Sequence, residues 1–190
     1  MRKINKNIEN PPDNFFIDLA DISSDFYRQL GFTPNMLTTV SLFFGILSCY
    51  LLYKGQNLFA MLCWFIAYYY DCADGFFARK YGMATKFGDL YDHVSDVSKV
   101  LCLFLVMYYL NKDKFLFWTP VFAFVFVIML IHLGCQEKLY DKDEESVTIN
   151  QLTELCPNID DIHGTKYFGV GTFILVTGYV ILTFSNDSLS

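Results

Sequence analysis

Residues 71–96 read DCADGFFARKYGMATKFGDLYDHVSD and stand between two strongly apolar runs. Four aspartates of this acidic stretch are spaced as on helix faces: Asp71, Asp74, Asp92 and Asp96. A single Asp at the centre of a membrane helix costs about 2.5 to 3.5 kcal/mol, so four without compensation would oppose insertion. A bound metal ion is the best candidate for that compensation.

The composition points to a polytopic membrane protein. Hydrophobic residues make up 54% of the 190 residues, and the mean hydropathy of +0.31 is above that of most soluble domains of this size. The formal net charge of −6 argues against nucleic acid as a partner, because phosphate binding needs a basic surface. The six cysteines show no CxxC pair, and we expect them to be reduced packing residues.

The first 32 residues are predicted to form a polar tail and a surface helix. Residues 1–14 are polar and contain no apolar signal segment, so we expect a mobile tail. Residues 15–32 alternate apolar and charged groups at helical spacing. This pattern predicts an amphipathic helix at the membrane surface, with a partly ordered linker as the alternative. Residues 33–190 then form the membrane domain.

Five apolar runs predict an all-α bundle of five transmembrane helices, at residues 36–53, 58–70, 100–110, 115–133 and 167–184. Thr33 and Pro34 mark the first helix start, and Gly55 marks its end. The second and third runs are too short, because crossing about 30 Å of hydrocarbon takes about 20 residues. Both helices must therefore extend into the acidic stretch, the third from near Gly88. A polar, acidic loop over residues 135–163 precedes the last helix, with a short amphipathic helix expected near residues 152–162.

Lys and Arg residues near the helix ends predict the orientation. Those on the side of the acidic stretch are Arg2, Lys3, Lys6, Arg28, Arg79, Lys80, Lys86, Lys138, Lys142 and Lys166. Those on the opposite side are Lys54, Lys112 and Lys114. Because basic residues stay on the cytoplasmic side, we expect the acidic stretch to face the cytoplasm, in either an endomembrane or the plasma membrane.

Two antiparallel helices around a turn at residues 80–87 would bring the aspartates to one cleft. In such a hairpin Asp71 lies level with Asp96, and Gly75 lies level with Asp92. Four carboxylates this close cannot all stay ionised unless cations join them. Two Mg²⁺ or Mn²⁺ ions would balance the charge, because these ions prefer oxygen ligands. Such a site suits phosphoryl transfer, in which a spare carboxylate removes a proton from the attacking hydroxyl.

The acidic stretch resembles the signature of CDP-alcohol phosphotransferases, DxxDGxxAR(x8)GxxxDxxxD. Every fixed position and spacing agrees, at Asp71, Asp74, Gly75, Ala78, Arg79, Gly88, Asp92 and Asp96. A weaker similarity covers residues 34–38, PNMLT, which resemble the PNxLT often found before the first membrane helix of the family. The resemblance implies a membrane enzyme that transfers a phospho-alcohol group from a CDP-alcohol to a second alcohol and releases CMP.

The resemblance also implies roles for single residues. The residues that it assigns to the metal ions are Asp71, Asp74, Asp92 and Asp96, with Asp96 also the general base. The residues that it assigns to the CDP group are Asp74, Gly75, Ala78, Arg79 and Gly88. Members of the family usually have six membrane helices, so five would be a departure. A homodimer is compatible with the resemblance, and the bilayer is an expected partner.

Several readings stay open for the substrates. We expect CDP-diacylglycerol as donor and inositol or serine as acceptor; a choline or ethanolamine phosphotransferase acting on diacylglycerol is the alternative. His93 beside Asp92 resembles the DHGCD of that second group, but Val94 and Ser95 replace its Gly and Cys. A non-catalytic ion transporter is the alternative of another class, although it would need acidic residues along several helices. Lys99 is expected to face lipid headgroups, with pairing to the nearby acid as the alternative.

Overall fold

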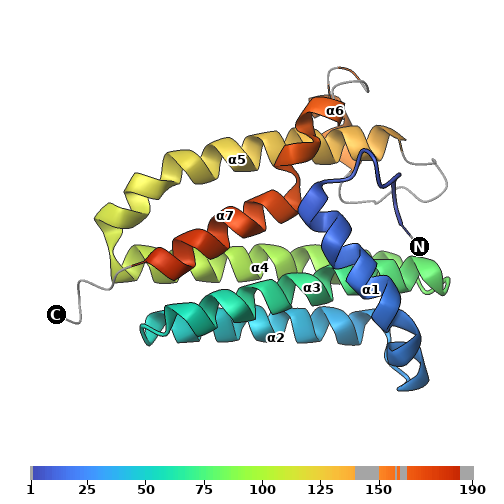
Figure 1. Ribbon diagram of the computed structural model, residues 1–190, viewed down its shortest axis with the longest axis horizontal. Coiled ribbons are helices and arrows are strands. Elements are labelled where there is room, and N and C mark those ends of the chain that lie inside the picture. Colours follow the sequence, from blue (N-terminus) through green and yellow to red (C-terminus); the bar gives the residue numbers. More distant parts are fainter. Residues whose placement is uncertain (1, 140–149, 157, 159–161, 185–190) are drawn as a thin grey trace.

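The computed structural model describes residues 2–139, 150–156, 158 and 162–184. All regular elements in these ranges are helices, which confirms the predicted all-α class. Five of them lie lengthwise beside one another (Figure 1): α2 (Pro34–Tyr53), α3 (Asn57–Lys80), α4 (Lys86–Leu110), α5 (Lys112–Leu139) and α7 (Val170–Thr183). α1 (Pro11–Gln29) crosses one end of this bundle (Figure 1). The short helices are η2 (Asn150–Leu155), α6 (Ile162–Thr165) and η4 (Lys166–Phe168).

Local sequence signals set the ends of α2 as predicted. The hydroxyl of Thr33 accepts a hydrogen bond from the backbone N–H of Met36 at 3.4 Å, and Pro34 occupies the first helical position. After the helix, Gly55 has a φ of +73°, in the left-handed region that glycine adopts readily. These residues turn the chain directly into α3.

α3 and α4 both extend into the acidic stretch, as their short apolar runs require. α3 continues to Lys80 and α4 begins at Lys86, close to the expected start at Gly88. The turn between them contains Gly82, with a φ of +64°. It ends at Thr85, whose hydroxyl accepts a hydrogen bond from the N–H of Gly88 at 3.0 Å.

Five transmembrane helices were predicted, but fewer described helices are long and apolar enough to cross a membrane. Among the described residues, four segments qualify: Pro34–Tyr53, Lys86–Leu110, Lys112–Leu139 and Ile162–Thr183. α3 has 24 residues, enough to cross about 30 Å at about 1.5 Å per residue, but three tyrosines and two aspartates make it more polar. Its polar half is covered by other helices, since Tyr68 is 5% exposed and Asp74 is 3% exposed. A hydropathy average cannot register that burial.

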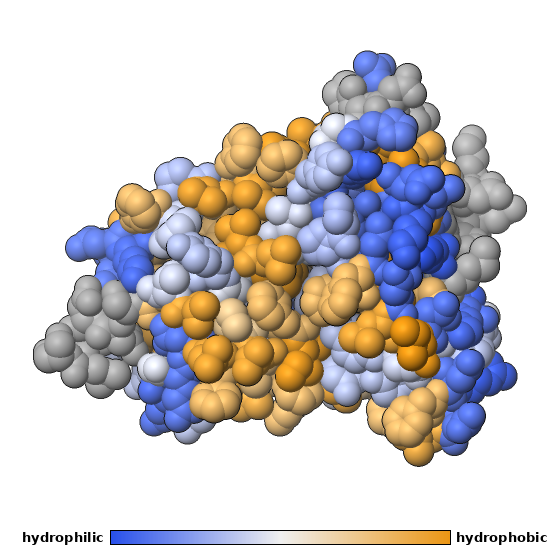
Figure 2. Space-filling model, in the orientation of Figure 1, coloured by the Kyte–Doolittle hydropathy of each residue, from blue (hydrophilic) through white to orange (hydrophobic). Residues whose placement is uncertain are grey.

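The outer surface of the bundle is apolar in the manner of a protein that faces lipid. Large apolar side chains are exposed along the long helices, among them Phe43, Leu105, Phe117, Phe124 and Val127. Figure 2 shows hydrophobic residues across the middle of one face, with hydrophilic residues at both ends. So much exposed apolar area is unfavourable in water and favourable in a bilayer. The interior core joins α2, α3, α4, α5 and α7.

The last part of the chain departs from the prediction in several ways. α5 runs on to Leu139, with Pro120 inside it, so the loop expected from residue 135 begins later. In the described part of residues 152–162, the expected helix corresponds to the 3-10 helix η2, and the acidic run at residues 141–145 and the acidic residues 160 and 161 lie outside the described residues. Cys135 and Cys156 form a disulfide, so the prediction of six reduced cysteines is wrong for this pair. The two cysteines are 21 residues apart in the sequence, and this separation gives no indication that they form a disulfide.

The N-terminal segment packs against the bundle, in contrast to the predicted mobile tail. Asn10 is fully buried, and its Nδ2 donates to the backbone oxygen of Lys166 at 2.6 Å and to Oγ1 of Thr172 at 2.9 Å. Glycine makes this approach possible, because a Cβ on Gly169 would lie 2.6 Å from the Cβ of Asn10. The order of the segment therefore depends on groups about 160 residues later in the chain.

α1 is the predicted amphipathic helix, and it begins four residues earlier than expected, at Pro11. Its inner face packs on α3, where Ala20 belongs to a buried cluster with Ala73 and Phe77. Its outer face exposes Ile22 and Phe26. The alternative of a partly ordered linker is excluded by this packing.

Asp13 of α1 is buried between α3 and α7. It accepts hydrogen bonds from the hydroxyl of Tyr68 and from the backbone N–H of Gly171. Burial raises the pKa of Asp13 to about 7, because the charged form loses its hydration, and the nearby Glu9 adds to this increase. The carboxyl therefore changes charge near neutral pH.

Asp13→Asn is expected to flatten the pH dependence of stability. Because the pKa of Asp13 in the folded protein lies above its unfolded value of 3.8, its contribution to stability is lost as the pH rises through about 7. The thermal midpoint of the wild-type protein in detergent should fall between about pH 4 and pH 7 and change little above that, and that of Asp13→Asn should fall less. Scanning fluorimetry measures both. Asp21→Asn, on the exposed side of the same helix, is the matched control; equal slopes in all three proteins would refute the assignment.

Candidate functional site

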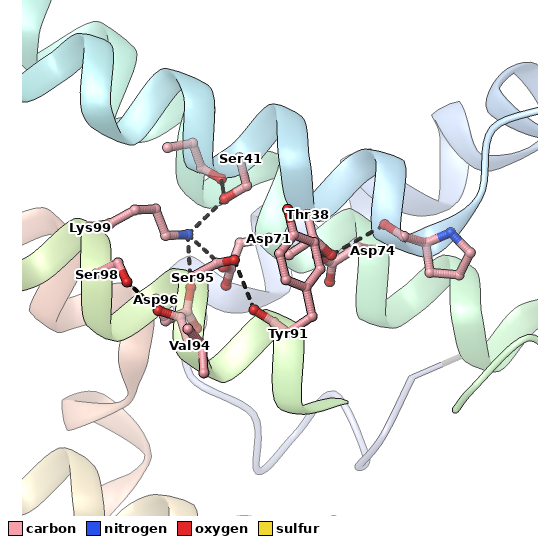
Figure 3. Close-up of polar contacts among 12 residues, drawn as sticks. Thr38, Ser41, Asp71, Asp74, Tyr91, Val94, Ser95, Asp96, Ser98 and Lys99 are labelled. Atoms are coloured by element: carbon pink, nitrogen blue, oxygen red, sulfur yellow. Dashed lines mark hydrogen bonds and ion pairs between the residues drawn. The ribbon is translucent and has the colours of Figure 1, made fainter. Parts of the chain in front are cut away.

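The site is built from α3 and α4, and α2 lies against both of them. α3 carries Asp71 and Asp74 near its end, and α4 carries Asp92 and Asp96 near its start. The ammonium of Lys99 contacts both Asp71 and Asp96 (Figure 3). Two carboxylates that share one ammonium lie at the same depth, as the antiparallel arrangement predicts.

Three of the four predicted metal ligands come together. One carboxylate oxygen from each of Asp71, Asp92 and Asp96 lies within 4.8 Å of the other two. Oδ1 of Asp92 is buried and has no hydrogen-bond partner among the described residues. A buried carboxylate oxygen without a partner is costly unless a cation binds it. The donor set is oxygen only, so it fits a hard divalent ion such as Mg²⁺ or Mn²⁺.

Asp74, the fourth predicted ligand, is not a member of this group of three. Its carboxylate accepts a hydrogen bond from the hydroxyl of Thr38 on α2, and the residue is 3% exposed. Thr38 belongs to the PNMLT segment at the start of α2. Figure 3 shows both side chains between α2 and α3. The segment therefore supplies a hydrogen-bond donor that orients Asp74.

The residues predicted for the CDP group divide into two kinds. Ala78 and Arg79 line a cavity that also borders the three clustered aspartates. Gly75 and Gly88 instead make room for neighbours. A Cβ on Gly75 would lie 3.2 Å from the guanidinium of Arg79, and a Cβ on Gly88 would lie 3.1 Å from the amide oxygen of Asn35. The two glycines thus let a cation and an amide approach the site.

The cavity joins the polar site to an apolar interior. Its volume is about 1030 Å³. At the polar end it is lined by Asp71, Asp92, Asp96, Arg79 and Lys86. Deeper in the bundle it is lined by Trp64, Phe104, Phe126, Met129, Phe173 and Ile174. A molecule that is charged at one end and apolar at the other would match both parts.

The structure corrects the prediction for Lys99 and adds Asp89. Lys99 does not face headgroups: it is 6% exposed and contacts two of the clustered aspartates. In the sequence, its position three residues after Asp96 was the feature that indicated an ion pair. Asp89 lines the cavity one turn before His93. Nδ1 of His93 lies 2.6 Å from the backbone oxygen of Asp89, so its ring is held within its own helix.

The comparison with known proteins agrees with this geometry. The sequence model of the family described as CDP-alcohol phosphatidyltransferase matches residues 32–156, about two thirds of the chain, including the whole acidic stretch. No curated protein and no solved structure matches. Together with four helices long and apolar enough to cross a membrane, the match identifies a multi-pass membrane protein of a transferase family in phospholipid synthesis. The chain belongs to the CDP-alcohol phosphatidyltransferase family.

Proposed function

We propose that this protein transfers the phosphatidyl group of CDP-diacylglycerol to a small alcohol, inositol or serine, and releases CMP. The observation that carries the proposal is the cavity, which connects the clustered aspartates with apolar walls. CDP-diacylglycerol has its diphosphate and its acyl chains in one molecule, so a single donor would occupy both parts. The polar end would then admit a water-soluble acceptor.

The chain's own residues suit the parts of this reaction. Asp71, Asp92 and Asp96 would hold a divalent ion, which supplies positive charge to the diphosphate when it is bound. The guanidinium of Arg79 lines the same end of the cavity and is a partner for phosphate oxygens. We assign Asp74 to the site as well, through its hydrogen bond to Thr38. Two ions, as the charge of four carboxylates predicts, are part of the proposal.

Asp96 is the proposed general base. Its side chain is 42% exposed, whereas that of Asp71 is 17% exposed, so Asp96 is the better placed of the two to meet an acceptor. The hydroxyl oxygen of the acceptor attacks the phosphorus that carries diacylglycerol, and its proton passes to Asp96. The bond from that phosphorus to the bridging oxygen breaks, and CMP leaves with the electron pair.

We also propose that residues 33–190 form the catalytic domain and that α1 covers it from the membrane surface. Contacts of Asn10 and Asp13 with the start of α7 support this arrangement. A homodimer is compatible with it.

Release of CMP tests the proposed reaction. Purified protein in detergent, given CDP-diacylglycerol with inositol or serine, should release CMP only when Mg²⁺ or Mn²⁺ is present. The same assay with CDP-choline or CDP-ethanolamine and diacylglycerol tests the alternative substrate arrangement. Release with that second set alone would exclude a phosphatidyl donor, and no metal-dependent release with any pair would refute the enzyme.

Asp96→Asn tests the general base. The variant should express normally and still bind Mn²⁺, while its rate of CMP release falls at least about 100-fold, because the amide cannot take the proton. Asp113→Asn, which removes an exposed acid at the other end of the bundle, should keep wild-type turnover. Substantial turnover by Asp96→Asn would remove Asp96 from this role.

The orientation leads to a separate prediction. We propose that the site faces the cytoplasm, because basic residues gather at its end of the helices. The disulfide between Cys135 and Cys156 lies at the same end, next to Gln136 in the cavity wall, and the cytoplasm keeps most thiols reduced. The bond is closed in the structure, so a cytoplasmic site requires that these two thiols are reduced in the cell.

Thiol trapping distinguishes the two orientations. Cells are quenched with acid, and the denatured protein is labelled with a maleimide before any reductant is added. A cytoplasmic site predicts that all six cysteines are labelled. Labelling of only the four free cysteines, Cys49, Cys63, Cys72 and Cys102, would place the site in an oxidising compartment.

A further inference from the structure

Lys99 is held in the site by a full set of contacts. Its Nζ donates to Oδ1 of Asp71 at 2.9 Å and to Oγ of Ser41 at 2.7 Å, and lies 2.7 Å from Oδ1 of Asp96 (Figure 3). An ammonium has three hydrogens to donate, and these three contacts use all of them. The side chain is only 7% exposed, so water contributes little to its solvation.

α2 provides a slot of matching shape for this side chain. A Cβ on Gly45 would lie 2.5 Å from Cγ and 2.7 Å from Cδ of Lys99, so only glycine leaves space for the stem. One turn earlier, Oγ of Ser41 donates its hydrogen to the backbone oxygen of Ala67 at 2.8 Å. The oxygen of Ser41 is therefore oriented to accept from the ammonium. The position of Lys99 is fixed by its surroundings as well as by the aspartates.

The ammonium and a divalent ion would draw on the same oxygen atoms. Asp71 and Asp96, which bind Lys99, are two of the three residues whose oxygens lie within 4.8 Å of one another. Asp92, the third, keeps a buried oxygen without a partner among the described residues. Lys99 thus neutralises part of the charge of Asp71 and Asp96 and leaves the charge of Asp92 for another cation. Two cations so close together repel each other strongly where water is scarce.

We infer that Lys99 is a positioning residue that acts as a built-in counter-cation: it holds Asp71 and Asp96 together when no metal is bound, and it lowers the affinity of the substrate-free site for divalent ions. The inference rests on the proposed metal site and adds its regulation. Without Lys99, mutual repulsion of the carboxylates would destabilise the metal-free protein, and a divalent ion would relieve more of that repulsion.

Mn²⁺ binding to the full chain in detergent tests this role. After removal of metal with a chelator, Mn²⁺ is titrated into wild-type protein and into Lys99→Met, and binding is followed by calorimetry. Met keeps a long, unbranched stem in the slot and removes the ammonium, with its charge and its N–H donors. The affinity of Lys99→Met should rise by about tenfold or more, because a nearby positive charge is removed from a site of low dielectric. Its thermal midpoint should fall without metal and recover with Mn²⁺.

Two further variants make the test decisive. Lys54→Met removes an exposed charge beyond the far end of α2 and should bind Mn²⁺ like the wild-type protein. Gly45→Ala keeps every charge but displaces the stem of Lys99, so its affinity should also rise. If Lys99→Met does not fold, Gly45→Ala alone decides the question.

The outcomes separate this inference from the proposed function. Binding by wild-type protein with no gain in Lys99→Met and Gly45→Ala would overturn the role of Lys99 and leave the enzyme untouched. A loss of affinity in Lys99→Met would also overturn it, since that result means that the ammonium only organises the ligands. If no protein binds Mn²⁺ and none releases CMP, the proposed metal site itself is refuted, and the inference falls with it.

Discussion

Carboxylates inside a membrane bundle require positive charge or hydrogen-bond donors close by, and the rest of the structure follows from this requirement. One face of α2 helps to provide these groups. Thr38 donates to Asp74, Ser41 accepts from the ammonium of Lys99, and Gly45 leaves space for the lysine stem. The spacing of these three residues places them on one side of the helix. α3 and α4 thus depend on α2 to bring their acidic ends together.

The remaining helices close the site and give it an apolar side. α5 and α7 contribute Phe126 and Phe173 to the cavity wall, opposite the part of α3 that carries Trp64. α1 and the N-terminal segment fasten the start of α7 through Asn10 and Asp13. Tyr68, which donates to Asp13, lies one turn before Asp71 on α3. α1 and the acidic site are therefore connected through a buried hydrogen bond.

The sequence was most informative where a local signal determines the structure. Thr33 and Gly55 predicted the ends of α2, because capping and left-handed backbone are local properties. Helical spacing placed Asp71 level with Asp96, and the family followed from eight fixed positions. The prediction that these two residues lie at the same depth required only the assumption that α3 and α4 run antiparallel.

Features that depend on distant contacts could not be predicted in this way. The buried position of Asn10 depends on the glycines at the start of α7, and the bond between Cys135 and Cys156 has no motif. The polar half of α3 lowers its hydropathy although other helices cover it. Lys99 had two interpretations, facing headgroups or pairing with an acid, and only its burial and its contacts with Asp71 and Asp96 in the folded protein distinguish them.

α3 and α4 together would form a divalent-cation site at the polar end of a lipid-sized cavity. Anomalous X-ray diffraction from crystals soaked in Mn²⁺ tests this site directly, because it locates the ion without reference to activity. We expect an anomalous peak bounded by the carboxylates of Asp71, Asp92 and Asp96, and no such peak in Asp92→Asn. If the protein releases CMP with Mn²⁺ but shows its peak elsewhere, or shows none, these aspartates do not form the metal site.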